Sequence, residues 1–179
     1  MTRSVLSFAA LVSSALLLAG CGDEGIVGQE GETITPTTGV ATPTEEPESF
    51  ETHDADPLTT NEISGDIVED PGMDVSYKWQ GTSSAPNGGT VVTVAVTNHS
   101  NNIMPPEALG EPELKYQGGK EKASRISAED AGLELEGLDF PLGKGATMNV
   151  QYVFDVSMGN LGDATFEIGN VIFEGNLNN

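Results

Sequence analysis

Few residues of this 179-residue chain could do covalent or acid–base chemistry. It has one cysteine, Cys21, and two histidines, His53 and His99. A thiol can act as a nucleophile or an attachment point, and histidine is the usual general base near neutral pH. His99 stands in a polar turn sequence and His53 in an acidic stretch without apolar periodicity. We therefore expect neither Ser-His-Asp nor Cys-His catalysis, and the chain is not predicted to be an enzyme.

Metal chemistry finds little support in the pattern. His99 and Met104 offer only two soft ligands, which do not make a site. Four acidic residues lie close enough in sequence to hold calcium, but their spacing matches no EF-hand loop and indicates a solvated charge run: Asp66, Glu69, Asp70 and Asp74. No metal and no cofactor are expected. A carboxylate pair for glycoside hydrolysis stays open, because such pairs are recognised in space.

One stretch could hold a negatively charged ligand. Four of the chain's seven basic residues lie between positions 115 and 125: Lys115, Lys120, Lys122 and Arg125. An anionic wall polymer is the ligand that such a patch would suit. The alternative is a solvated hairpin whose bases balance neighbouring acids. Gly118-Gly119-Lys120 lacks the remainder of a phosphate loop and predicts the turn of that hairpin.

The first twenty residues have the features of a segment that determines the location of the protein. Arg3 precedes an uncharged, mostly apolar run over positions 5–18, which is too short to span a bilayer as a permanent helix. Its length fits a secretory signal followed by small residues, ending at Gly20 and Cys21. An unpaired cysteine in a secreted protein is a liability unless it is used. Cys21 is therefore interpreted as an attachment point.

The ending Leu18-Ala19-Gly20-Cys21 resembles the lipobox of bacterial lipoproteins. The resemblance implies that the Cys21 thiol receives a diacylglyceryl group and that the signal is cut between Gly20 and Cys21. It also implies a lipid anchor on the extracytoplasmic face of the cell membrane. Two or more acyl chains hold a protein firmly, at about 0.8 kcal/mol per buried CH₂.

The segment from Cys21 to residue 72 is predicted to be a disordered tether. Fifteen acidic residues and no lysine or arginine lie between Gly22 and Asp74, with threonines and prolines interleaved. So polar a segment cannot bury enough apolar surface to offset the entropy of ordering it. The Thr/Pro pattern also fits O-glycosylation, with no site assignable. The whole chain, with a formal net charge of −21, is not predicted to bind nucleic acid.

Residues 73–179 are predicted to form an all-β domain. Apolar residues alternate with period two in five runs, separated by Gly-, Pro- and Asn-rich turns: 73–79, 90–98, 114–116, 148–156 and 166–173. A register change at Gly169-Asn170 predicts a bulge in the last run. One short helical turn is expected at residues 127–130. Several short strands at this spacing predict an antiparallel sandwich of immunoglobulin-like type, without the inter-sheet disulfide.

Two of these runs carry a second resemblance. The strand Thr90–Asn98, together with Gly143-Lys144-Gly145 and the run 150–156, resembles an immunoglobulin-like domain of unknown function found in bacterial lipoproteins. That family is related in fold to the secreted immunogenic antigens of mycobacteria. It implies no catalytic residues.

Three functional hypotheses follow from this organisation. The first is a membrane-anchored envelope module that binds an envelope protein or a cell-wall polymer through loops of the sandwich. The second is a passive structural or immunogenic surface lipoprotein without a dedicated ligand. The third is a solute- or metal-binding lipoprotein, against which the absence of a two-domain cleft and of a ligand cluster argues.

Overall fold

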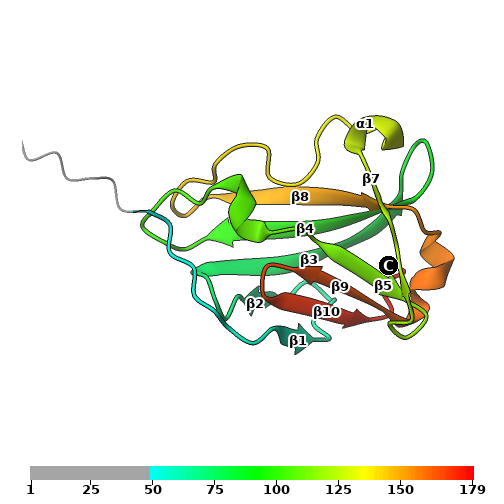
Figure 1. Ribbon diagram of the computed structural model, residues 1–179, viewed down its shortest axis with the longest axis horizontal. Helices are drawn as coiled ribbons and strands as arrows, with labels where there is room; N and C mark the ends of the chain where they lie inside the picture. The colour runs from blue at the N-terminus through cyan, green and yellow to red at the C-terminus, as the bar shows by residue number, and fades with distance from the viewer. Residues whose placement is uncertain (1–48) are drawn as a thin grey trace, which may run out of the picture. The chain divides into compact units, whose positions relative to one another are not determined.

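The computed structural model describes residues 49–179, which fold as an immunoglobulin-like β-sandwich (Figure 1). Its elements, in chain order, are β1 (Leu58–Thr60), β2 (Ile67–Glu69), β3 (Val75–Ser84), β4 (Thr90–Asn98), η1 (Pro106–Leu109), β5 (Glu113–Tyr116), β6 (Glu121–Lys122), β7 (Arg125–Ile126), α1 (Ala128–Ala131), β8 (Thr147–Phe154), η2 (Met158–Asp163), β9 (Ala164–Ile168) and β10 (Val171–Gly175). The predicted fold class is confirmed.

The strands form two five-stranded sheets. One has the order β2-β3-β4-β8-β7 and the other β1-β10-β9-β5-β6. Without β1 and β2, these orders are those of strands A-B-E-D and G-F-C-C′ of the immunoglobulin fold. All pairs are antiparallel except β1 with β10, which is parallel. Strands β1 and β2 therefore extend both sheets on the same side of the sandwich.

The alternation that predicted β3, β4 and β8 reflects their packing. Strand β4 lies between β3 and β8 at the centre of its sheet, and its inward residues Val92, Val94 and Val96 are fully buried. Tyr77 and Trp79 of β3 lie in the same core, as their alternation predicts. The strand then continues to Ser84 after a bulge at Gly81, where φ is +105°, a conformation that glycine tolerates best.

The boundary predicted for the tether is wrong. The structure places β1, β2 and the preceding residues within the sandwich, and Phe50 packs against the core. The backbone amide of His53 donates a hydrogen bond to the Gly72 carbonyl, so the segment before β1 is hydrogen-bonded to the rest of the domain. Tertiary pairing with β10 and β3 supplies the order that a polar sequence alone does not predict. The remainder of the predicted tether, up to residue 48, lies outside the described residues.

The prediction of a bulge at Gly169-Asn170 is also wrong. These two residues form the tight turn of a hairpin, in which Val171 pairs with Ile168 and Phe173 with Phe166. Gly169 has a φ of +56°, as a two-residue hairpin turn requires. A β-bulge inserts one residue, and a two-residue hairpin turn places Ile168 and Val171, three positions apart, on the same face. Both shift the apolar alternation by one residue, so the sequence pattern does not distinguish them.

The Asp70 carboxylate joins the added N-terminal strands to this hairpin. Its side chain is buried and accepts hydrogen bonds from the Tyr77 hydroxyl (3.0 Å), the Gly72 amide (2.7 Å) and the backbone and side-chain amides of Asn170 (3.0 and 2.8 Å). Burial and the nearby carboxylate raise the pKa of Tyr77 well above its usual range. Asp70 is thus a structural residue, and the prediction of a solvated charge run was wrong for it.

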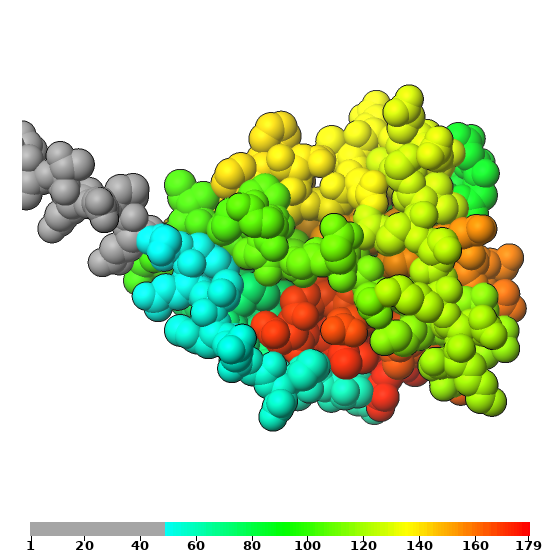
Figure 2. Space-filling view, in the orientation of Figure 1, coloured from blue at the N-terminus to red at the C-terminus, as the bar shows by residue number. Residues whose placement is uncertain are grey.

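The sandwich has two distinct ends. We call the end at which the described chain begins the proximal end and the opposite end the distal end. At the proximal end, Ser49 accepts a hydrogen bond from the side chain of Asn102, shortly after the last residue of β4. The distal end carries the β3–β4 turn, the β5–β6 turn and η2, which are joined by hydrogen bonds from Ser84 to Met158 and from Gly118 to Asp163. Figure 2 shows the first described residues and η2 at opposite ends of the visible face. The nine residues of β4 separate the ends by about 26 Å.

The corrected boundary can be tested by truncation. A chain of residues 73–179 lacks β1, β2 and the Asp70 carboxylate, which leaves the Tyr77 hydroxyl and the Asn170 amides without their acceptor. We expect it to be less stable than residues 49–179 by about 3 kcal/mol or more, as measured by urea unfolding with Trp79 fluorescence. Asp70→Asn in the longer chain should lose about 1–3 kcal/mol. Equal stability of the two chains would contradict the boundary.

Candidate binding site around Arg125

The predicted basic stretch divides into separate ion-pair groups. Lys115 of β5 and Lys122 of β6 both contact the carboxylate of Glu113, Lys115 at 3.2 Å. These strands are antiparallel neighbours, with Lys115 opposite Lys122, so both ammonium groups reach the same side chain. The two lysines lower the pKa of Glu113, mainly through the hydrogen bond from Lys122. This group is the balanced hairpin that the sequence offered as the alternative to a ligand patch.

Lys120 lies apart from this group, in the β5–β6 turn at the distal end. Its side chain is exposed, and no ion pair of Lys120 occurs among the described residues. The four predicted residues are therefore not brought together as one positive patch.

Arg125 is held differently from the lysines. Its guanidinium carbon lies 4.8 Å from the centre of the Tyr152 ring and 5.6 Å from that of Phe154, and its Nη2 forms an ion pair with Glu136. Both rings belong to β8, next to β7, and Arg125 is directly opposite Phe154 in the register. Burial lowers the pKa of Arg125, although a guanidinium remains protonated at neutral pH.

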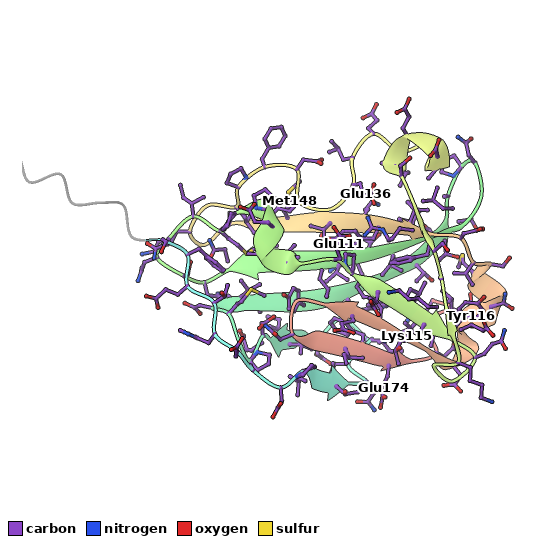
Figure 3. All side chains as sticks on the ribbon, viewed as in Figure 1. Glu111, Lys115, Tyr116, Glu136, Met148 and Glu174 are labelled. Carbon is purple, nitrogen blue, oxygen red and sulfur yellow. The ribbon has the colours of Figure 1, made fainter. Side chains whose placement is uncertain are left out.

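The two acidic partners of Arg125 differ in exposure. The Glu136 side chain is 26% exposed and its other oxygen accepts a hydrogen bond from the Ala128 amide at 3.1 Å, so it is fixed. The Glu111 side chain is 96% exposed, and its Oε2 lies 3.7 Å from Nη1, beyond ordinary hydrogen-bond distance. Figure 3 shows Glu111 and Glu136 in the same region of this face, away from Lys115. Glu111 is the loosely held partner.

A shallow depression of about 430 Å³ lies beside the guanidinium. It is lined by Glu111–Glu113 from the segment entering β5 and by Lys122–Arg125 from the crossing between β6 and β7. Because β6 and β7 are edge strands of different sheets, the depression lies at the side of the sandwich. The site residue that sequence reasoning missed is Glu111, whose approach to Arg125 depends on this crossing.

The structure also brings together a serine and a histidine. Ser76 Oγ lies 2.7 Å from His99 Nε2, and Glu69 Oε2 lies 4.0 Å from the same nitrogen. In a catalytic triad the carboxylate contacts the opposite ring nitrogen, which holds the histidine tautomer that can accept the serine proton. Ser76 is buried on β3. The contact is a part-buried hydrogen bond between β3 and the turn after β4.

Asn98 shows why the turn after β4 is ordered. Its side chain is fully buried and donates to the Asn102 and Leu142 carbonyls, while its oxygen accepts from the Ser100 amide and hydroxyl. Although Asn98-His99-Ser100 has the pattern of a glycosylation sequon, the amide nitrogen is committed to the fold.

The remaining predicted site lies elsewhere in the chain. Gly20 and Cys21 are outside the described residues. Within residues 49–179, no helix is long and apolar enough to cross a bilayer, and no three His, Cys, Asp or Glu side chains gather as metal ligands.

Comparisons with known proteins leave the resemblances as they stood. Neither a family model, nor a curated protein, nor a solved structure matches this chain.

Replacing Arg125 should destabilise the domain. Arg125→Met removes two cation–π contacts and leaves the Glu136 carboxylate without its partner, for an expected loss of about 1–3 kcal/mol. Lys120→Met, a matched loss of one charge at an exposed turn, should change the stability by less than about 0.5 kcal/mol. Urea unfolding of both variants checks this; equal effects would show that Arg125 is not held as described.

The Tyr152 phenol beneath Arg125 predicts sensitivity to alkali. Burial, partly offset by Arg125, raises the pKa of Tyr152 to about 12. Because the unfolded pKa is about 10, this contribution to stability is complete below pH 10 and is lost as the pH rises towards 12. Tyr152→Phe should therefore lose less stability between pH 9 and 11.5 than the unchanged protein. Identical loss, measured by urea midpoints at each pH, would contradict this.

Proposed function

We propose that the protein is a lipid-anchored module of a bacterial cell envelope, in which Cys21 carries the lipid and the sandwich binds an envelope protein or a wall polymer. The lipobox-like ending at Cys21 supports the anchor. The immunoglobulin-like topology supports a binding role, because such sandwiches present loops at the ends of a rigid scaffold.

The observation that carries the proposal is the arrangement of the two ends. The chain coming from Cys21 joins the domain at the proximal end, beside Asn102, and the loop cluster lies at the distal end. The 27 residues between Cys21 and Ser49 can extend over at most about 90 Å. A domain attached in this way can present its distal loops away from the bilayer and towards envelope partners.

A passive surface lipoprotein, structural or immunogenic, is the second candidate. It is favoured by the lysine pairing, since Lys115 and Lys122 already have a carboxylate partner. The solute- or metal-binding hypothesis has less support from the described residues, whose depressions are open and shallow and whose acidic side chains form no ligand cluster.

Site-directed photo-crosslinking in intact cells separates the first two candidates. A photo-crosslinking amino acid replaces Lys120 at the distal end or, as the matched control, Lys144 in the turn before β8 at the proximal end. We expect one recurrent partner from position 120, absent from position 144 and lost in a Cys21→Ala variant. The same background from both positions would contradict a dedicated distal partner and favour the passive module.

A further inference from the structure

We propose that the depression beside Arg125 binds a single carboxylate group on an otherwise uncharged ligand, which takes the place of the Glu111 carboxylate. This inference goes beyond the proposed function, because the depression lies at the side of the sandwich and not among the distal loops. It also replaces the four-residue basic patch predicted from the sequence with one fixed guanidinium.

The first support is the preorganisation of Arg125. The Tyr152 and Phe154 rings hold the guanidinium by its face, and Glu136 holds it through Nη2. A guanidinium fixed in this way loses little side-chain entropy when it binds a carboxylate, and its planar fork matches the geometry of that group. Nη1 lies towards the loosely held partner.

The second support is the state of Glu111. A carboxylate that is 96% exposed and 3.7 Å from its partner is a weak ion pair, of the kind that contributes little to stability. An incoming carboxylate can displace it at small cost. Glu111 therefore occupies the position of a ligand without being fixed there.

The local charge decides what the ligand can be. Lys115, Lys122 and Arg125 face Glu111, Glu113 and Glu136, so the cluster is neutral. When Glu111 moves away, the cluster gains one positive charge, which one carboxylate neutralises. A polyanion would add further negative charge near a domain that is already acidic. The depression of about 430 Å³ has room for one amino-acid residue or one sugar.

The test is a titration of the full-length chain in a neutral detergent at constant ionic strength. Three carboxylates serve as probes: sodium acetate, N-acetylalanine as a peptide-like frame and glucuronate as a sugar frame. The side-chain resonances of Arg125 report binding by NMR, since its Nε is buried. We expect a saturable shift with acetate, and a lower Kd for the probe whose frame fits. N-acetylalaninamide, the uncharged analogue, should cause none.

Two matched variants make the result specific. Glu111→Gln removes the internal competitor and should tighten binding about two- to fivefold, the range of an exposed ion pair. Glu121→Gln makes the same charge change on β6 at a residue that neither lines the depression nor pairs with Arg125, and it should not tighten binding. Equal gains from both variants would reduce the effect to net charge and overturn the proposal.

Two further outcomes would also overturn it. One is the lack of a saturable shift in Glu111→Gln, and the other is an equal response to chloride or to the uncharged analogue. A failed titration would leave the crosslinking result standing. A failed crosslink with a saturable titration would remove the envelope partner but not the site.

Discussion

The sandwich depends on an aromatic cluster that joins its two sheets without a disulfide. Trp79 of β3 lies 6.0 Å from Phe166 and 5.5 Å from Phe173, ring centre to ring centre. The rings of Tyr152 and Phe154 of β8 lie 6.3 and 6.1 Å from that of Phe166. Phe166 of β9 thereby touches three rings of the opposite sheet. Immunoglobulin domains commonly place a tryptophan against the inter-sheet disulfide. Here the tryptophan comes from the first strand of the core, and aromatic packing replaces the covalent bond.

The candidate site is an outward extension of this cluster. Arg125 stacks on the same Tyr152 and Phe154 rings that contact Phe166, so the guanidinium is held by the core. The crossing from β6 to β7, which carries the chain from one sheet to the other, brings Arg125 to these rings. Arg125 therefore contributes both to the stability of the domain and to the lining of the depression. For that reason, an arginine-to-serine change would disturb the fold as well as any ligand.

The central strands were predictable because every second residue along much of β4 and β8 is apolar and lines the main core, as Val92, Val94 and Val96 do in β4. The strands β1 and β2 have three residues each, too few for an alternation to be recognised. Strand β1 is ordered by a partner 113 residues away and β2 by the following strand β3. The role of Arg125 has the same limit. Basic residues close in sequence indicated a single patch. In the structure, the register of β5 and β6 brings Lys115 and Lys122 to Glu113, and the pairing of β7 with β8 brings Arg125 to the Tyr152 and Phe154 rings.

Because the domain is acidic, binding of an anion depends on the groups nearest to it, such as the Arg125 guanidinium. The described part holds 21 acidic and six basic side chains, so its long-range field repels anions. At physiological salt that field is screened over about 8 Å, and contacts within a depression are decided by the nearest groups. The Arg125 guanidinium, with its displaceable partner Glu111, can therefore bind a ligand with a single carboxylate, whereas the negative field of the domain repels a polyanion. The same field disfavours strongly anionic polymers at the distal loops, so we propose a protein or a weakly charged glycan as the envelope partner.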